Sequence, residues 1–164
     1  MDRLLKIWDL LNNNSLLHQI DFAKNDFVKS LEMTSDNSRV IVSSSEGNIR
    51  IYEIESGKQL AITEGFESSD VICLTQDQSK LVISGGGPDN QNNNRIIDVG
   101  KMKTMTKVKN AHFKKVSCLA ISPDCKMLAS GSNDFLIKLW DLRTFKPINE
   151  LVGHALNDLH SIQA

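Results

Sequence analysis

The chain has 164 residues, of which 40% are hydrophobic and 24% are charged, and its formal net charge is −1. This composition is typical of a globular chain with a sizeable core, and the balanced charge excludes the basic field that nucleic acid or an anionic membrane would need. No apolar run reaches the roughly 18 residues of a membrane-spanning helix, which excludes a transmembrane protein of that kind.

A four-residue motif recurs along the chain, with an acidic residue between hydrophobic ones. Its copies, in chain order, are Ile7-Trp8-Asp9-Leu10, Ile51-Tyr52-Glu53-Ile54, Ile96-Ile97-Asp98-Val99 and Leu139-Trp140-Asp141-Leu142. The acidic position falls at residues 9, 53, 98 and 141, at spacings of 44, 45 and 43 residues. Residues 31–54 also align with residues 119–142 without a gap. A period of this length indicates a chain built of structural repeats.

The repeats divide the chain into units of similar length within one domain that covers residues 1–164. We expect units at about 1–21 (partial), 22–63, 64–109, 110–152 and 153–164 (partial). The most regular unit, 110–152, contains four short runs of strand-forming residues at 116–121, 127–130, 136–140 and 147–152, with turns at 122–124 and 132–134. These runs are apolar on nearly every residue, which predicts strands covered on both faces.

The unit 110–152 resembles one whole repeat of the WD-repeat family. The resemblance rests on Asn110-Ala111-His112, Ser122-Pro123-Asp124, the segment 128–134 and the closing Lys138-Leu139-Trp140-Asp141. It is weaker for 22–63 and weakest for 64–109. The resemblance implies an all-β propeller in which each unit is a four-stranded blade. We expect an incomplete arc of about three full blades plus partial blades at both ends, cut from a larger ring.

One alternative to the open arc is a closed four-blade ring. In that ring, a strand at 158–163 would join strands at 3–9 and 15–21 in a single blade. An open arc would instead expose a blade face at each end, which predicts self-association through those faces.

The resemblance implies a hydrogen-bonded network inside the best-preserved repeat. Trp140 would donate to Ser130, Ser130 would bond His112, and His112 would bond Asp134. Serine, histidine and aspartate also form hydrolase triads, but the strained G-x-S-x-G turn of such nucleophiles is absent. We therefore expect the network to stabilise the blade, with no catalytic, cofactor or metal-binding residues in the chain.

The other repeats depart from this pattern. Tyr52 and Ile97 replace the tryptophan, Glu46 replaces the turn aspartate, and no histidine stands at the expected place near Lys24. These repeats should lack the full network. Cys125 occupies a turn position where the family usually has glycine, which predicts a residue with positive φ there.

Repeat 64–109 carries an insertion of four residues between its second and third strands. The polar run Gly85–Asn94 predicts a loop there, and the asparagine runs 12–14 and 92–94 are both interpreted as loops. In the family this loop lies on the rim most used for partners. The candidate partner contacts on that rim are Pro88, Asp89, Asn90 and Asn133.

Two further segments carry a predicted role. Trp140-Asp141-Leu142-Arg143 matches a box found in substrate receptors of cullin-type ubiquitin ligases, which makes Arg143 a candidate contact and that receptor role an alternative function. Four lysines between Lys101 and Lys109 predict a basic edge strand, because lysine discourages strands from adding to a sheet edge.

The function expected from these observations is a non-catalytic scaffold for protein–protein interaction. Its partners would be other proteins, with no nucleic acid and no membrane. The three cysteines have no C-x-x-C spacing and favour reduced thiols, which predicts a cytoplasmic location, with a cytoskeletal or ciliary one as an alternative.

Overall fold

All regular structure in the described part of the chain is β-strand. The computed structural model describes residues 3–64, 69–86 and 92–152. The strands, in chain order, are β1 (Leu4–Asp9), β2 (Ser15–Asp21), β3 (Val28–Met33), β4 (Arg39–Ser44), β5 (Ile49–Glu53), β6 (Gln59–Thr63), β7 (Val71–Leu74), β8 (Lys80–Gly86), β9 (Asn92–Asp98), β10 (Lys103–His112), β11 (Val116–Ile121), β12 (Met127–Ser132), β13 (Leu136–Asp141) and β14 (Lys146–Val152).

The strands form antiparallel sheets of consecutive strands, which we call blades. Blade I is the pair β1–β2, blade II is β3–β6, blade III is β7–β10 and blade IV is β11–β14. The last three are four-stranded, and every described sheet is open rather than closed on itself. The prediction of an all-β fold of four-stranded blades is therefore confirmed, whereas the single-domain assignment and the boundaries between repeats stay a prediction.

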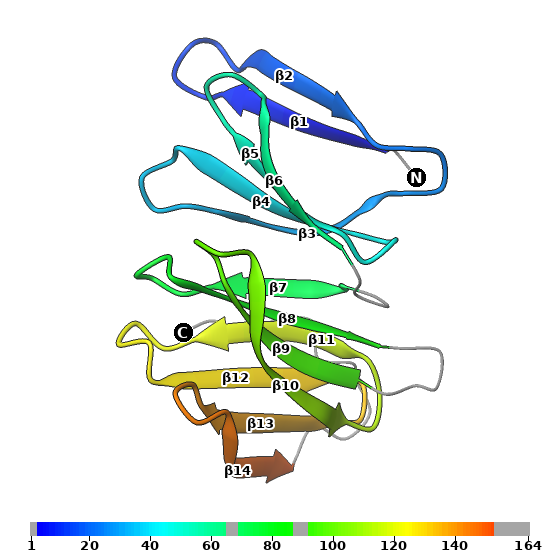
Figure 1. Cartoon of the computed structure of the whole chain (residues 1–164), viewed down its shortest axis with the longest axis vertical. Coiled ribbons are helices and arrows are strands. Elements are labelled where there is room, and N and C mark those ends of the chain that lie inside the picture. Colours follow the sequence, from blue (N-terminus) through cyan, green and yellow to red (C-terminus); the bar gives the residue numbers. More distant parts are fainter. Residues whose placement is uncertain (1–2, 65–68, 87–91, 153–164) are drawn as a thin grey trace.

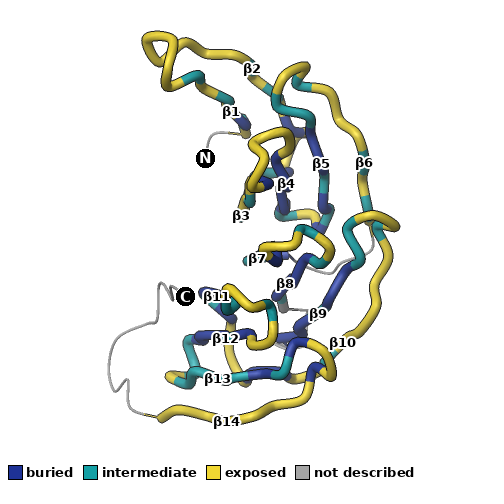
Figure 2. The backbone as a smooth tube through the Cα atoms, turned by 90° about the vertical axis from the view of Figure 1, so that its left-hand side faces the viewer, coloured by how far each residue is buried: buried dark blue, intermediate teal, exposed yellow. Residues whose placement is uncertain are grey.

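The blades stack side by side along a curved arc (Figures 1 and 2). The first strands β3, β7 and β11 line the inner side of the arc, and β7 contacts both of its neighbours. The fourth strands β6, β10 and β14 lie on the outer side, where most residues are exposed (Figure 2). The lysine-rich segment after Lys101 forms β10 at the edge of blade III, so the predicted edge strand is confirmed.

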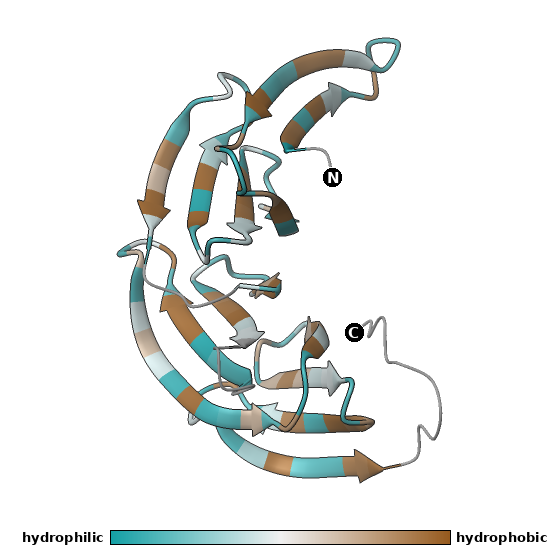
Figure 3. Cartoon of the chain, turned by 90° about the vertical axis from the view of Figure 1, so that its right-hand side faces the viewer, coloured by the Kyte–Doolittle hydropathy of each residue, from teal (hydrophilic) through white to brown (hydrophobic). Residues whose placement is uncertain are grey.

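The hydrophobic core consists of three layers, each between two neighbouring blades. Between blades I and II lie Leu5, Phe22, Val40, Val42 and Tyr52. Between blades II and III lie Ile41, Ile49, Ile51, Ile72, Leu81, Ile83 and Ile97. Between blades III and IV lie Val82, Ile96, Ala111, Val116, Leu119, Leu128, Trp140, Leu142 and Phe145. Successive residues of a middle strand thus enter different layers, which explains why those strands are apolar on both faces (Figure 3).

The repeated acidic residue ends β1 in blade I and the third strand in blades II to IV, and at Asp9, Asp98 and Asp141 its carboxylate holds the following turn. The Asp9 carboxylate accepts a hydrogen bond from the Leu11 N–H at 2.8 Å, and Asp98 accepts one from the Lys101 N–H at 2.9 Å. Asp141 accepts one from the Arg143 N–H, also at 2.9 Å. The turn after each first strand is repeated in the same way, with positive φ at Asn37, Gln78 and Cys125. The period in the sequence is therefore a period of turn geometry as well as of core residues.

The predicted loop Gly85–Asn94 is wrong at both of its ends. Strand β8 extends to Gly86 and β9 begins at Asn92, with Gly85 opposite Asn93. Asn92–Asn94 are buried, and the Ser84 hydroxyl donates to the Asn94 carboxamide oxygen at 2.7 Å. The hairpin is longer than expected because polar side chains that pair inside the sheet can be buried. The other asparagine run, 12–14, does lie in an exposed turn, with positive φ at Asn13 and Asn14.

Candidate protein-interaction surfaces

The four residues expected to form a network are brought together in blade IV. The Trp140 indole N–H donates to Ser130 Oγ at 2.8 Å, and His112 Nε2 lies 2.8 Å from the same oxygen. His112 Nδ1 lies 3.0 Å from a carboxylate oxygen of Asp134. With the proton of a neutral imidazole on Nδ1, Ser130 donates to Nε2 and every polar group in the chain of contacts has a partner. Asp134 also accepts the backbone N–H groups of Phe113 and Leu136.

Burial favours the neutral form of the network histidine. Desolvation lowers the pKa of His112, and the charge and hydrogen bond of Asp134 oppose that shift only in part. Burial alone would raise the pKa of Asp134, but hydrogen bonds from the Phe113 N–H and from His112 outweigh it and lower the pKa. The pair is therefore a neutral imidazole that donates to a carboxylate.

The network has no access to a substrate. Ser130 is fully buried, and His112 is 2% exposed. The described residues also contain no group of three or more histidine, cysteine or acidic side chains that could hold a metal ion. This arrangement supports stability and leaves no room for a nucleophilic attack on a bound molecule.

Blade II contains a different buried polar centre, which the sequence pattern did not predict. Arg50 Nη1 lies 3.0 Å from a carboxylate oxygen of Asp26 and donates to Ser44 Oγ at 3.1 Å. The Asp26 side chain is fully buried, and the Arg50 guanidinium lies 5.0 Å from the centroid of the Phe22 ring. The missing histidine near Lys24 is thus replaced by an ion pair. Asp26 lies only two residues beyond Lys24, where the histidine was expected. An acidic residue near that place, together with an arginine in the third strand, was the signal in the sequence that could have predicted the ion pair.

The turns of the arc lie on two opposite rims (Figure 1). We call the first the loop rim; it holds the connections into each first strand and those between second and third strands, at 22–27, 45–48, 64, 69–70, 113–115 and 133–135. We call the other the turn rim; it holds the turns at 10–14, 34–38, 54–58, 75–79, 99–102, 122–126 and 142–145.

The candidate partner contacts predicted from the sequence do not share one surface. Asn133 lies on the loop rim, whereas Arg143 lies on the turn rim with a side chain that is 79% exposed. Pro88, Asp89 and Asn90 lie outside the described residues.

The loop rim of blade IV exposes aromatic rings beside lysines. Phe113 is 82% exposed, and Lys138 Nζ lies 6.0 Å from the centroid of its ring. Lys114 Nζ lies 5.2 Å from the centroid of Phe135, which is also exposed. No sequence pattern marked Phe113, because it stands in the connection between β10 and β11, outside the motif residues of its repeat. Exposed aromatic rings of this kind are typical anchors of protein interfaces.

A polar pocket of about 410 Å³ opens on the same rim. It is lined by Lys29, Ser30, Asp70, Val71, Lys115, Ser117 and Asn133, which come from three successive blades. Asp70 lies between two lysines, with a carboxylate oxygen 3.4 Å from Lys29 Nζ and 3.6 Å from Lys115 Nζ.

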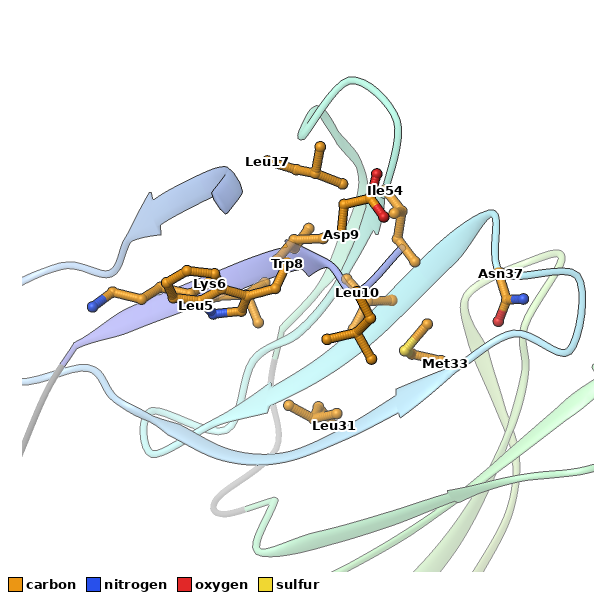
Figure 4. Close-up of a pocket in the computed structure, with 12 residues that line it drawn as sticks. Leu5, Lys6, Trp8, Asp9, Leu10, Leu17, Leu31, Met33, Asn37 and Ile54 are labelled. Carbon is orange, nitrogen blue, oxygen red and sulfur yellow. The ribbon is translucent and has the colours of Figure 1, made fainter. Parts of the chain in front are cut away.

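A second surface is an apolar groove of about 530 Å³ below β1 (Figure 4). Its walls include Leu5, Ile7, Trp8, Leu10, Leu17, Leu31, Met33, Val40 and Ile54. Trp8 is 51% exposed, although Tyr52, Ile97 and Trp140 at the equivalent positions of the other blades are buried. The difference arises because β1 pairs only with β2 among the described strands, so no second strand covers the indole.

The predicted strand pair at the start of the chain is observed, since β1 pairs with β2. Residues 158–163, which the closed-ring alternative would add to that pair, lie outside the described residues. Across residues 3–64, 69–86 and 92–152 no helix is long and apolar enough to cross a membrane.

The chain is similar to known repeat proteins. Residues 103–141 match the family described as WD domain, G-beta repeat. A guanine nucleotide-binding protein subunit beta-like protein of Encephalitozoon cuniculi is 25% identical over 96% of this chain and 48% of its own length. Autophagy-related protein 16 of Arabidopsis thaliana is 26% identical over 94% of this chain and 29% of its own length. The chain therefore spans at most about half the length of these relatives.

Solved structures share the fold. A chain in the crystal structure of the mitotic checkpoint complex has a TM-score of 0.80 and 22% identity, with 94% of this chain and 47% of that chain covered. The structure of U3-55K has a TM-score of 0.76 and 19% identity, with 87% and 44% covered. At this identity the likeness establishes the arrangement of blades.

We expect the two motif tryptophans to differ sharply in their contribution to stability. Trp140→Ala should lower the free energy of unfolding by about 3–5 kcal/mol, because it leaves a cavity and unpairs Ser130. The matched change Trp8→Ala, at a half-exposed position of the same motif, should cost less than about 1.5 kcal/mol. Urea unfolding of both variants measures the difference, and equal losses would contradict this account of the network.

Stability should also fall as the pH falls below neutrality. The folded-state pKa of His112 is lowered, so its contribution is fully present above the unfolded-state value of about 6.5 and is lost below it. The lowered pKa of Asp134 adds a further loss only in the carboxylate range near pH 4. Thermal unfolding from pH 7.5 to 5.5 should show a falling midpoint for the native chain and a flatter dependence for His112→Gln. An unchanged slope in that variant would assign the effect to other groups.

Proposed function

Since the chain is a member of the WD-repeat β-propeller family, we propose that it is a non-catalytic scaffold that binds partner proteins through its loop rim. The family generally serves as a protein-interaction scaffold. The observation that carries the proposal is the exposed ring of Phe113, with Lys138 Nζ 6.0 Å from its centroid. Phe135, on the same rim, is a second exposed ring, with Lys114 Nζ 5.2 Å from its centroid. A large apolar side chain held in water costs free energy that a bound partner would recover.

The non-catalytic part of the proposal is supported by the burial of the polar centres. The blade IV network is buried together with Trp140, which donates to Ser130. The pair of Asp26 and Arg50 lies inside blade II. A cytoplasmic location belongs to the same proposal and is supported by the free thiols of Cys73, Cys118 and Cys125.

Affinity capture from a lysate with matched variants tests the loop rim. Phe113→Asp should remove a set of captured proteins, because it places a charge where an apolar contact forms. Leu11→Asp is the control, since Leu11 is 96% exposed on the turn rim and the charge change is the same. Equal capture by Phe113→Asp and the native chain would refute the loop-rim proposal. A cullin adaptor that is lost only with Arg143→Asp would favour the receptor function instead.

We also propose that the apolar groove below β1 supports self-association. Trp8, Leu31 and Met33 leave apolar surface open to water there, which is unusual for a chain that stays monomeric.

Light scattering on the purified chain at rising concentration measures this association. The native chain should exceed its monomer mass, and Trp8→Lys should return it to the monomer. Phe113→Lys, at an exposed aromatic position on the loop rim, should leave the mass unchanged. A native chain that stays monomeric throughout the series would rule out this role of the groove.

A further inference from the structure

Blade I presents an open strand edge. In blades II, III and IV the strand that carries the motif lies between a second strand and a fourth strand. Strand β1 carries the same motif but pairs only with β2 among the described strands. The Arg3 carbonyl accepts the Phe22 N–H at 2.9 Å, so the next residue, Leu4, directs its backbone groups toward the other edge. That edge can therefore pair with one more antiparallel strand.

The apolar groove below β1 lies where a second strand of blade I would pack. Leu31 in β3 is 50% exposed, whereas Ile72 and Leu119, at the equivalent positions of β7 and β11, are buried. Ile72 shares a core layer with Ile41 of the preceding second strand, and Leu119 shares one with Val82 of the preceding second strand. Leu31 borders the groove because no described strand covers it in this way (Figure 4).

The described second strands show which side chains fit this position in a blade. In each, the residue opposite Tyr52, Ile97 or Trp140 is buried and apolar. In blades II and III a basic residue precedes it, opposite the motif acid, and two further apolar residues follow it. Serine or glycine completes all three strands. The segments, in chain order, are Arg39-Val40-Ile41-Val42-Ser43-Ser44, Lys80-Leu81-Val82-Ile83-Ser84-Gly85 and Met127-Leu128-Ala129-Ser130-Gly131-Ser132.

Strand β1 offers the matching positions, since Asp9 and Trp8 both line the groove. We propose that its open edge binds an extended segment of a partner protein, antiparallel to β1, with one basic residue followed by apolar residues and then by serine or glycine. The basic side chain stands opposite Asp9, the first apolar side chain packs on the Trp8 indole, and the second covers Leu31. This inference goes beyond the loop-rim proposal, because it names a second surface and the chemistry of its ligand.

Fluorescence anisotropy with a labelled synthetic peptide tests the proposal on the purified chain. The peptide has the sequence of residues 38–45, which contains β4, and the control peptide has the same composition with its apolar residues separated by polar ones. Leu31→Asp should weaken binding by about tenfold or more, because it places a charge beneath the added strand. Leu60→Asp is the matched control, since Leu60 is 45% exposed on β6 of the same blade, and it should leave binding unchanged. Met33→Asp, at another groove position of β3, repeats the test where Leu31→Asp lowers the folded fraction.

Amide hydrogen exchange distinguishes strand addition from simple adhesion of an apolar peptide to the groove. The bound peptide should slow exchange in β1 by about tenfold or more, because a new ladder protects its N–H groups. Strand β14 is the internal control, since it is also an edge strand, and its exchange should not change.

The outcomes separate this inference from the proposed self-association, which uses the same groove. Equal binding of the two peptides, equal weakening by Leu31→Asp and Leu60→Asp, or binding without slower exchange in β1 would overturn the inference. A native chain that exceeds its monomer mass but does not bind the peptide keeps the self-association and excludes the added strand. A chain that stays monomeric and binds the peptide does the reverse.

Discussion

Apolar packing between neighbouring blades is the interaction on which the rest of this structure depends. Each middle strand places successive side chains into two different layers, as Ile41 and Val42 do on either face of blade II. Burying one such side chain contributes about 1.5–3 kcal/mol, whereas a hydrogen bond contributes about 1 kcal/mol net. The layers therefore outweigh any single polar network. This difference explains how blades II and III keep the same four-stranded form with Tyr52 and Ile97 in place of the motif tryptophan.

The same packing explains how much of the fold was predictable from the sequence. The acidic residues at 9, 53, 98 and 141 recur because each ends a strand before a turn, where Asp9, Asp98 and Asp141 accept backbone N–H groups. The apolar runs recur because both faces of a blade are covered. The acidic turn residues and the apolar core residues thus repeat with the same period. Both patterns involve residues close together in the chain, so the sequence alone can predict them. The positive φ predicted at Cys125 follows from the same turn geometry.

The features that the sequence did not predict depend on contacts between residues far apart in the chain, or on polar residue types that are unusual in a core. Asn92–Asn94 look like a loop by composition, but each faces a partner strand that supplies pairing, as Ser84 does for Asn94. Asp26 and Arg50 form a buried pair across blade II, and neither residue type is usual in a core. The loop-rim cluster joins Lys29, Asp70 and Lys115 from three repeats, so no single repeat reveals it.

Aspartate recurs on the turn rim because a carboxylate accepts the N–H and O–H groups of a turn, and at several positions these hydrogen bonds lower its pKa. The side-chain hydrogen bond of Thr34 is the largest cause that lowers the pKa of Asp36 to about 2, and Asp77 and Asp124 are lowered in the same way by Thr75 and Ser122. These carboxylates therefore stay charged in the folded chain, and basic residues beside the same turns balance them, among them Arg39, Lys80 and Lys126.

The connections into the first strands, on the loop rim, differ from blade to blade. They contain Asp26 and Phe27 in one, Asp70 in the next and Phe113 with Lys114 in the third. Asp26 and Asp134 each accept backbone N–H groups on this rim and so hold its turns, whereas the ring of Phe113 is 82% exposed. Because the fold does not depend on the Phe113 side chain, that residue can be determined by the contacts it makes with a partner.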